Sequence, residues 1–225
     1  MSPSRPTISV RWLAVLSASF ASLSAVAWLF SAPLGALLSS LTIQASDRAA
    51  WNLAHELSTS MLLGAASMSN YVHGTVGILV LTAALAWAWT HCGRPQARVR
   101  LLVAVPVGML LNVAVKAAIH RVRPSWSIVD LPASFSFPSG HVAEATVFYG
   151  SLAIEVAKLE TSRLQKALCV AGAATMIAIV ASSRIIVGVH FLSDCIGALG
   201  EGLLWLAACF SRPPLTPAPM RENVR

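Results

Sequence analysis

The chain has 225 residues, of which 56% are hydrophobic and only 11% are charged, and its mean hydropathy is +0.70. Soluble domains carry about a quarter charged residues, so this deficit excludes an ordinary soluble domain and indicates lipid as the solvent. The net charge of +7 comes without a basic run or interleaved aromatic residues, so a nucleic-acid partner is not expected.

Six apolar stretches are long enough, or nearly so, to cross a bilayer, which takes about 20 residues. They cover residues 12–32, 75–91, 99–119, 141–157, 165–182 and 191–210. The fourth contains Glu144 and Glu155, so we expect its neighbours to enclose it. The sequence therefore predicts an all-α fold, a polytopic membrane helix bundle with six transmembrane helices.

A further apolar segment, residues 57–68, is too short to cross. Leu53, Met61 and Met68 fall roughly on one face of a helix, which is typical of a helix lying along the membrane surface. We therefore expect a short interfacial helix over residues 47–70. The spans leave room for one domain, residues 1–210, and the Pro-rich residues 211–225 are expected to form a disordered cytoplasmic tail.

The distribution of basic residues predicts the orientation in the membrane. Six crossings place both termini on one side, where eleven basic residues fall, against five on the other side. The positive-inside rule then puts both termini in the cytoplasm. Short loops and the lack of an Asn-x-Ser/Thr sequon favour a bacterial cytoplasmic (inner) membrane, with the motifs described next at its outer, periplasmic face.

The first motif, "KAAIHRVRP", spans residues 116–124. Lys116 and Arg123 are seven residues apart, close to two helical turns, so we expect both to project from one helix face. Pro124 biases the preceding residue away from helical geometry, and the helix is expected to end near Arg123. By itself this pattern also fits simple contact with lipid headgroups. His120 and Arg121, inside the motif, receive no role.

The second motif, "FPSGHVAEA", opens the fourth span. Ser139 marks a helix start, where free N–H groups and the helix dipole attract anions. Gly140 lets an oxyanion approach the backbone closely, and His141 lies in the first turn beside such an anion. By itself the pattern also fits an N-cap serine and an interfacial histidine. Glu144 is interpreted as tuning His141 or as pairing with Lys116.

The third motif, "SRIIVGVHFLSD", joins the fifth and sixth spans. His190 and Asp194 are four residues apart, so they are expected to share one face of the sixth helix. An aspartate at that position accepts a hydrogen bond from one ring nitrogen and leaves the other nitrogen nucleophilic. Arg184 supplies a planar fork that suits phosphate oxygens. Alone, the motif also fits a structural Arg–Asp pair.

The three motifs occur in this order and all lie at one membrane face. Together, Lys-x6-Arg-Pro, Pro-Ser-Gly-His and Ser-Arg-x5-His-x3-Asp resemble the type 2 phosphatidic acid phosphatase (PAP2) superfamily, in its integral membrane lipid phosphatase branch. The likeness covers roughly residues 75–205. It implies that residues 1–210 form a single PAP2-type membrane phosphatase domain with a motif core at 99–205.

The resemblance also implies a phosphate-binding set made of side chains and one backbone amide. Its members are Lys116, Arg123, Ser139, Gly140 and Arg184. Phosphoryl transfer depends mainly on positioning and on charge stabilisation. Because five donors neutralise the phosphate, we expect neither a metal ion nor a cofactor.

The implied catalytic residues are His190, Asp194 and His141. His190 would attack phosphorus while Asp194 orients its ring. His141 would protonate the leaving oxygen and then activate the water that hydrolyses the phosphohistidine.

The predicted partners are a lipid phosphate or diphosphate substrate and the bilayer itself. Undecaprenyl pyrophosphate is the first expectation for the substrate, with phosphatidylglycerophosphate, phosphatidate and a lipid A phosphate left open. Two other functions stay open as alternatives: a vanadate-dependent haloperoxidase-like enzyme, whose relatives are soluble, and a non-enzymatic transporter that uses its intramembrane charges. The oligomeric state is left open by the sequence.

Overall fold

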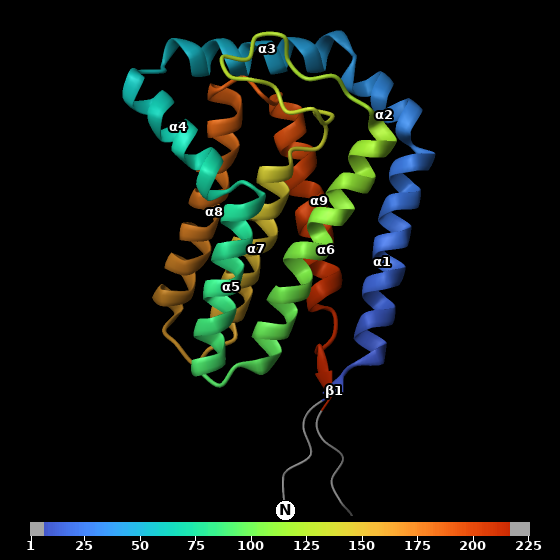
Figure 1. The fold of residues 1–225 in the computed structure, drawn as a ribbon, viewed down its shortest axis with the longest axis vertical. Helices are drawn as coiled ribbons and strands as arrows, with labels where there is room; N and C mark the ends of the chain where they lie inside the picture. Colours follow the sequence, from blue (N-terminus) through green and yellow to red (C-terminus); the bar gives the residue numbers. More distant parts are fainter. Residues whose placement is uncertain (1–6, 217–225) are drawn as a thin grey trace, which may run out of the picture.

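The computed structural model describes residues 7–216, whose secondary structure is helical apart from one short strand pair, with an irregular loop over residues 120–139. The helices are α1 (Val10–Leu29), α2 (Ser31–Leu38), α3 (Leu41–Glu56), α4 (Ser60–Val72), α5 (Thr75–His91), α6 (Pro95–Ile119), α7 (Gly140–Ala157), α8 (Arg163–Ile186) and α9 (Leu192–Phe210). Figure 1 shows α1 and α5 to α9 running lengthwise, while α3 crosses one end of the bundle. The predicted all-α class is confirmed.

Each of the six predicted spans corresponds to a helix, but not every one passes as a membrane span. Within residues 7–216, four helices are long and apolar enough to cross: α1, α6, α8 and α9. Taken as one bent span, α4 and α5 raise the number to five. The prediction of six spans is not confirmed, because α5 alone has only 17 residues and α7 contains Glu144 and Glu155.

The predicted single interfacial helix over residues 47–70 is wrong, because the chain breaks within it. The first part belongs to α3, which ends at Glu56. The hydroxyl of Thr59 accepts a hydrogen bond from the backbone N–H of Leu62 at 3.3 Å and so starts a new helix, α4. Helix α4 then meets α5 at an angle of 64°. Only α3 lies across the end of the bundle (Figure 1).

The two ends of the described chain meet at the opposite end of the bundle from α3 (Figure 1). Strand β1 (Thr7–Ile8) pairs antiparallel with β2 (Leu215–Thr216). Leu215 is buried, and its backbone exchanges two hydrogen bonds of 3.0 Å with the side chain of Gln96. The predicted disordered tail is therefore wrong for residues 215 and 216, and residues 217–225 lie outside the described part.

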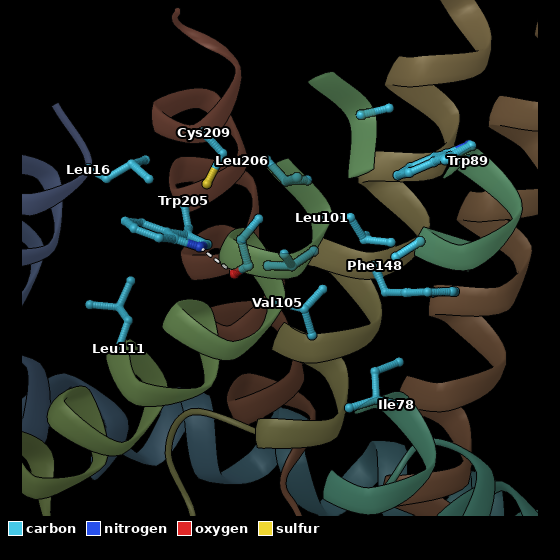
Figure 2. Close-up of a cluster of buried hydrophobic side chains, with 14 of the residues drawn as sticks. Leu16, Ile78, Trp89, Leu101, Val105, Leu111, Phe148, Trp205, Leu206 and Cys209 are labelled. Carbon is cyan, nitrogen blue, oxygen red and sulfur yellow. Dashed lines mark hydrogen bonds between the residues drawn. The ribbon is translucent and has the colours of Figure 1, made fainter. Parts of the chain in front are cut away.

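Trp205 of α9 is one of the largest side chains of the apolar core (Figure 2). Its indole N–H donates to the carbonyl of Ala104 over 2.8 Å, and its ring is fully buried. Gly108 permits this approach, since a Cβ there would lie 3.1 Å from the indole ring. The same cluster contains buried side chains of α1, α6, α7 and α9, including Leu16, Leu101, Val105, Leu111, Phe148 and Leu206.

Large apolar side chains are exposed along the sides of the bundle. They include Leu13, Val26, Trp28, Val80, Trp87, Leu110, Val113, Leu168, Ile179, Ile196 and Leu203. A soluble monomer rarely exposes apolar surface on this scale, whereas lipid covers it without cost. The protein is therefore an integral membrane protein.

One buried ion pair joins α6 and α7 in the half of the bundle away from α3. Arg100 pairs with Glu155, and its Nε also donates to the carbonyl of Cys209 over 3.2 Å. This pair accounts for one of the two glutamates of the fourth predicted span, because a charge buried with a partner is tolerated there.

Candidate active site

His190 lies in the short connection between α8 and α9, and Asp194 is the third residue of α9. The ring Nδ1 is 3.3 Å from Asp194 Oδ2, and both residues are buried. The same oxygen accepts a hydrogen bond from the N–H of Phe191 at 3.0 Å. The predicted contact is present, but the pair meets at a helix start and not along one helix face. Gly188, with φ of +73°, makes the preceding turn.

The hydrogen bond to Asp194 determines which nitrogen of His190 faces the site. With its proton on Nδ1, the ring presents a lone pair at Nε2, which lies 3.2 Å from Arg123 Nη1. Burial lowers the pKa of His190 to about 4, against the opposite effect of the neighbouring carboxylate. The ring is therefore neutral at pH 7, which is the form that a nucleophile requires.

Lys116 and Arg123 do not share a helix face, so that prediction is wrong. Helix α6 ends at Ile119, and His120 adopts a left-handed conformation with φ of 54°. Arg123 consequently lies in the following loop, where its Nη1 donates to the carbonyl of Val189 at 2.9 Å. Its side chain nevertheless reaches the same site as Lys116.

Lys116 supports the loop that leads into α7. Its ammonium donates to the carbonyl of Phe135 at 3.0 Å, to that of Ser136 at 3.3 Å and to that of Pro138. All three of its protons thus have backbone partners, and no ion pair with Glu144 is formed. The predicted pairing of these two residues is wrong.

Helix α7 begins at Gly140, and Ser139 occupies the N-cap position. The Ser139 side chain makes no capping bond, and its buried Oγ has no partner among the described residues. His141 Nε2 is likewise buried without a partner. Two unsatisfied polar atoms therefore lie at a helix start, where free backbone N–H groups favour an anion.

Arg184 projects from the last turn of α8 and is 2% exposed. Its Nη1 donates to Asn70 Oδ1 at 2.6 Å, its Nη2 to the carbonyl of Ala66 at 3.1 Å and its Nε to Ser183 Oγ at 3.1 Å. These bonds use three of the five N–H donors of a guanidinium. The other two N–H donors remain for a ligand, and the bonds to Asn70 and Ala66 of α4 fix the direction in which they point.

A cavity of about 880 Å³ collects six of the eight predicted site residues in its lining: Lys116, Arg123, Gly140, His141, Arg184 and His190. Ser139 and Asp194 have no exposed surface. Ser139 directly precedes Gly140 of the lining, and Asp194 contacts His190. From this polar end the cavity continues between α5 and α6 along Leu79, Pro106, Met109, Leu110 and Val113. It thus joins a cationic chamber to an apolar groove at membrane depth.

Three polar residues of the site lie on separate helices and were not predicted together. Asn112 of α6 donates to Glu201 Oε2 of α9 at 2.9 Å. Glu144 of α7 lines the cavity, and its Oε2 is buried with no partner among residues 7–216, as is Glu201 Oε1. No sequence pattern relates positions on three different helices, so only the fold reveals this cluster.

These features define a class: an all-helical integral membrane protein whose buried His–Asp pair faces a cationic cavity. The sequence profile of the PAP2 superfamily matches residues 97–215, more than half of the chain. The chain belongs to the PAP2 superfamily, and the predicted resemblance is confirmed. Phosphatidylglycerophosphatase B of Bacillus subtilis (strain 168) is 35% identical over 105 residues, which are 46% of this chain and 52% of that protein. The aligned part thus spans about half the length of that relative.

Two solved structures share the fold. The crystal structure of a transmembrane PAP2 type phosphatidylglycerolphosphate phosphatase from Bacillus subtilis gives a TM-score of 0.72 at 25% identity, covering 84% of this chain and 94% of that one. The crystal structure of Aquifex aeolicus LpxE gives 0.53 at 20% identity, covering 72% and 90%. The second likeness concerns the fold alone.

Proposed function

We propose that this protein is a membrane lipid phosphatase that hydrolyses a phosphate ester through a phosphohistidine on His190. The observation that carries the proposal is the cavity, which His190 lines together with three cationic side chains from different segments, one of which, Arg123, lies 3.2 Å from its Nε2. A buried histidine held by Asp194 is a nucleophile, and clustered cations stabilise the charge of a transferring phosphoryl group.

The proposed reaction has two steps. The Nε2 of His190 attacks phosphorus, the P–O bond to the lipid alcohol breaks, and His141 protonates the leaving oxygen. His141 then takes a proton from water, which attacks phosphorus, breaks the N–P bond and releases inorganic phosphate. Arg123 leaves its bond to the ring nitrogen and, with Arg184, holds the phosphate oxygens.

The remaining predicted residues bind the phosphate in this proposal. The unsatisfied Ser139 Oγ and the Gly140 amide donate to its oxygens, and Lys116 adds positive charge while it supports the loop. With four donating residues and the charge of Lys116, the proposed reaction requires no metal ion. We expect EDTA to leave activity unchanged and vanadate, which mimics phosphate, to inhibit.

A lipid substrate is supported by the apolar continuation of the cavity between α5 and α6. An acyl chain fits beside Leu79, Met109 and Leu110 while the phosphate reaches His190. Burying apolar chain carbons contributes about 0.8 kcal/mol per methylene. A water-soluble phosphate ester lacks this contribution and is expected to react more slowly.

Phosphatidylglycerophosphate is the proposed substrate. Both B. subtilis relatives are named for it, and Glu144 adds an argument from this chain. A phosphate offers only acceptors to the unsatisfied Oε2 of Glu144, whereas the glycerol headgroup carries a hydroxyl that donates. Undecaprenyl pyrophosphate, the first expectation from the sequence, stays an untested prediction, as do phosphatidate and lipid A phosphate.

The decisive assay is phosphate release by the purified protein from these four lipid phosphates. We expect release that is fastest with phosphatidylglycerophosphate, and loss of activity in His190→Ala. His91→Ala is the matched control, because His91 is exposed and outside the cavity. No release from any lipid phosphate would contradict the proposal.

We also propose that the site faces the periplasm of a bacterial inner membrane, with both termini cytoplasmic. Cys92, in the exposed connection between α5 and α6, would then face the cytoplasm. An impermeant thiol reagent should label a Cys92-only variant in inverted vesicles and spare it in spheroplasts. Ala133→Cys, exposed in the loop before α7, should give the opposite pattern in a variant without other cysteines. Labelling of Cys92 from outside would reverse the orientation.

A further inference from the structure

Arg121 is bound to the catalytic aspartate, although the motif pattern assigns it no role. It lies in the loop after α6, and its side chain is 12% exposed. Nη1 donates to Asp194 Oδ1 at 2.6 Å and to Ser193 Oγ at 2.7 Å, while Nη2 donates to Asp47 Oδ2 at 2.9 Å. The guanidinium also covers the ring of Phe191 at 4.0 Å. The group is thus fixed on several sides.

Asp47 connects this arrangement to α3, the helix that crosses the end of the bundle (Figure 1). The residue is 2% exposed, and its carboxylate accepts from Ser193 N at 2.8 Å and from Ser193 Oγ at 2.7 Å. A buried carboxylate is costly unless it is paired. The pair with Arg121 therefore holds α3 on the start of α9.

The two oxygens of Asp194 have different partners. Oδ2 accepts from His190 Nδ1, from Phe191 N and from Ser136 Oγ. Oδ1 accepts from Arg121. A carboxylate held at both oxygens cannot rotate about its Cβ–Cγ bond, so Arg121 also determines the direction in which Oδ2 faces the imidazole.

Arg121 lies outside the chamber that would bind phosphate. It is not among the residues that line the 880 Å³ cavity, and it lines a second cavity of about 520 Å³ instead, together with Arg48 and His120. Its two Nη atoms are turned to Asp47, Asp194 and Ser193. It therefore acts on His190 through Asp194 and not on the substrate.

We propose that Arg121 is a positioning residue of the phosphatase reaction: by bridging Asp47 to Asp194 it fixes the carboxylate that orients the nucleophile His190. The inference rests on the proposed function, and it makes the surface helix α3 part of the catalytic architecture. Arg121 balances the charge of Asp194, and Asp47 holds Arg121 in place.

The charges around His190 determine how each change acts on its titration. The ring faces Asp194 of α9, Arg123 of the loop, Lys116 of α6 and His141 of α7. Removing the charge of Arg121 leaves the Asp194 carboxylate less balanced and favours the imidazolium form. Removing the charge of Asp47 has the opposite effect and favours the neutral imidazole.

The test compares Arg121→Gln, Arg121→Lys and Asp47→Asn in the purified full-length protein, with phosphatidylglycerophosphate in mixed micelles. For Arg121→Gln we expect kcat to fall by about tenfold or more, because a displaced nucleophile reacts slowly, with little change in KM. In the pH profile of kcat/KM, the acid limb should move to higher pH. Asp47→Asn should lose less rate and move the limb to lower pH, and the double variant should lose no more than Arg121→Gln.

Arg100→Gln is the matched control, because Arg100 forms a buried ion pair away from the site. It should lower the thermal midpoint and leave the acid limb in place. If Arg121→Gln does not fold, Arg121→Lys takes its place in the test. This variant retains the charge, so its kcat should fall while the acid limb of the pH profile stays in place. Wild-type kcat in both Arg121 variants, or a loss in Arg121→Gln with an unmoved limb, would overturn the proposal.

A readout without turnover separates this inference from the proposed function. Diethyl pyrocarbonate modifies neutral imidazole, and mass spectrometry measures its rate at His190. At pH 8, where the ring is neutral in both proteins and only its fixation by Asp194 differs, we expect a severalfold faster modification in Arg121→Gln than in the wild type and no change in Arg100→Gln. If the wild type releases no phosphate but modification is still faster in Arg121→Gln, the phosphatase proposal alone is rejected. Equal modification rates in the two proteins reject the role of Arg121.

Discussion

Arg184 Nη1 donates a hydrogen bond to Asn70 Oδ1 over 2.6 Å, which ties the end of α8 to the last turn of α4. The segment that sequence reasoning places along the membrane surface thus supplies a wall of the cavity. Its amide and one of its carbonyls direct the guanidinium, so two donors remain for a phosphate. A guanidinium with fixed orientation loses less entropy when it binds an anion.

Asn70→Ala is expected to weaken the binding of phosphate and its mimics. Without the amide, Arg184 samples other rotamers, and the inhibition constant for vanadate should rise by about tenfold, as for one lost charge-assisted hydrogen bond. Vanadate inhibition of phosphate release measures this directly. Asn52→Ala, at an exposed position of α3, should leave the constant unchanged. An unaltered constant in Asn70→Ala would show that the tether does not orient Arg184.

The spacing within each motif encodes local geometry, and the packing of α6, α7, α8 and α9 brings the three motifs to one cavity. The four-residue spacing of His190 and Asp194 gives a contact at 3.3 Å even though His190 precedes the helix. Conversely, the predicted common face of Lys116 and Arg123 fails, because His120 leaves the helical conformation before Pro124 can end the helix. Spacing alone therefore does not decide whether two residues share a helix face.

The partners of the motif residues could not be predicted from the sequence. Asp47 and Asn70 contact Arg121 and Arg184 across 74 and 114 residues of chain. Such contacts depend on how α3 and α4 fold over the bundle, and the break at Thr59 that allows it lies inside a pattern that also fits one continuous helix. Hydropathy predicts the apolar spans, but it does not predict how α3 and α4 fold over the bundle.

Ser139→Ala tests the unsatisfied hydroxyl at the start of α7. Because Ser139 Oγ has no partner among the described residues, its removal should leave the thermal midpoint unchanged. It should lower kcat/KM by about tenfold, the effect of one lost hydrogen bond to a charged group. Ser151→Ala is the matched control, since Ser151 Oγ is also buried with no partner in the described part of the chain but lies about three helical turns beyond the start of α7. Equal activities of the two variants would contradict the role of Ser139.

Glu144 is expected to determine which lipid phosphate reacts best. Glu144→Leu removes the acceptor for a headgroup hydroxyl and should lower the ratio of kcat/KM between phosphatidylglycerophosphate and phosphatidate by about tenfold. Glu144→Gln retains an acceptor oxygen and should keep most of the preference. A ratio that is equal in wild type and Glu144→Leu would mean that this side chain does not read the headgroup.

His190 should make the stability of the fold depend on pH. Its pKa of about 4 in the folded protein lies below the ordinary value of 6.5, so the unfolded chain binds the proton more readily. The contribution of His190 to the free energy of unfolding is fully present above pH 6.5. It is lost as the pH falls toward 4, by about 2 kcal/mol between pH 7 and 5. The thermal midpoint in detergent should therefore fall less over this range in His190→Gln than in wild type. An equal fall in both proteins would indicate that His190 is not neutral when folded.

The proposed reaction passes through a covalent intermediate on His190. Rapid acid-free quenching of the enzyme with phosphatidylglycerophosphate labelled in its terminal phosphate should trap label on the peptide that contains His190. The bond should be stable in base and labile in acid, as expected for an N–P bond. His141→Ala should accumulate more label than wild type when the leaving group is good, because hydrolysis of the intermediate loses its base. Label on the His190 peptide, absent in His190→Ala, is the predicted result. Steady phosphate release by wild type with no label on this peptide, or undiminished release by His190→Ala, would exclude a phosphohistidine on His190.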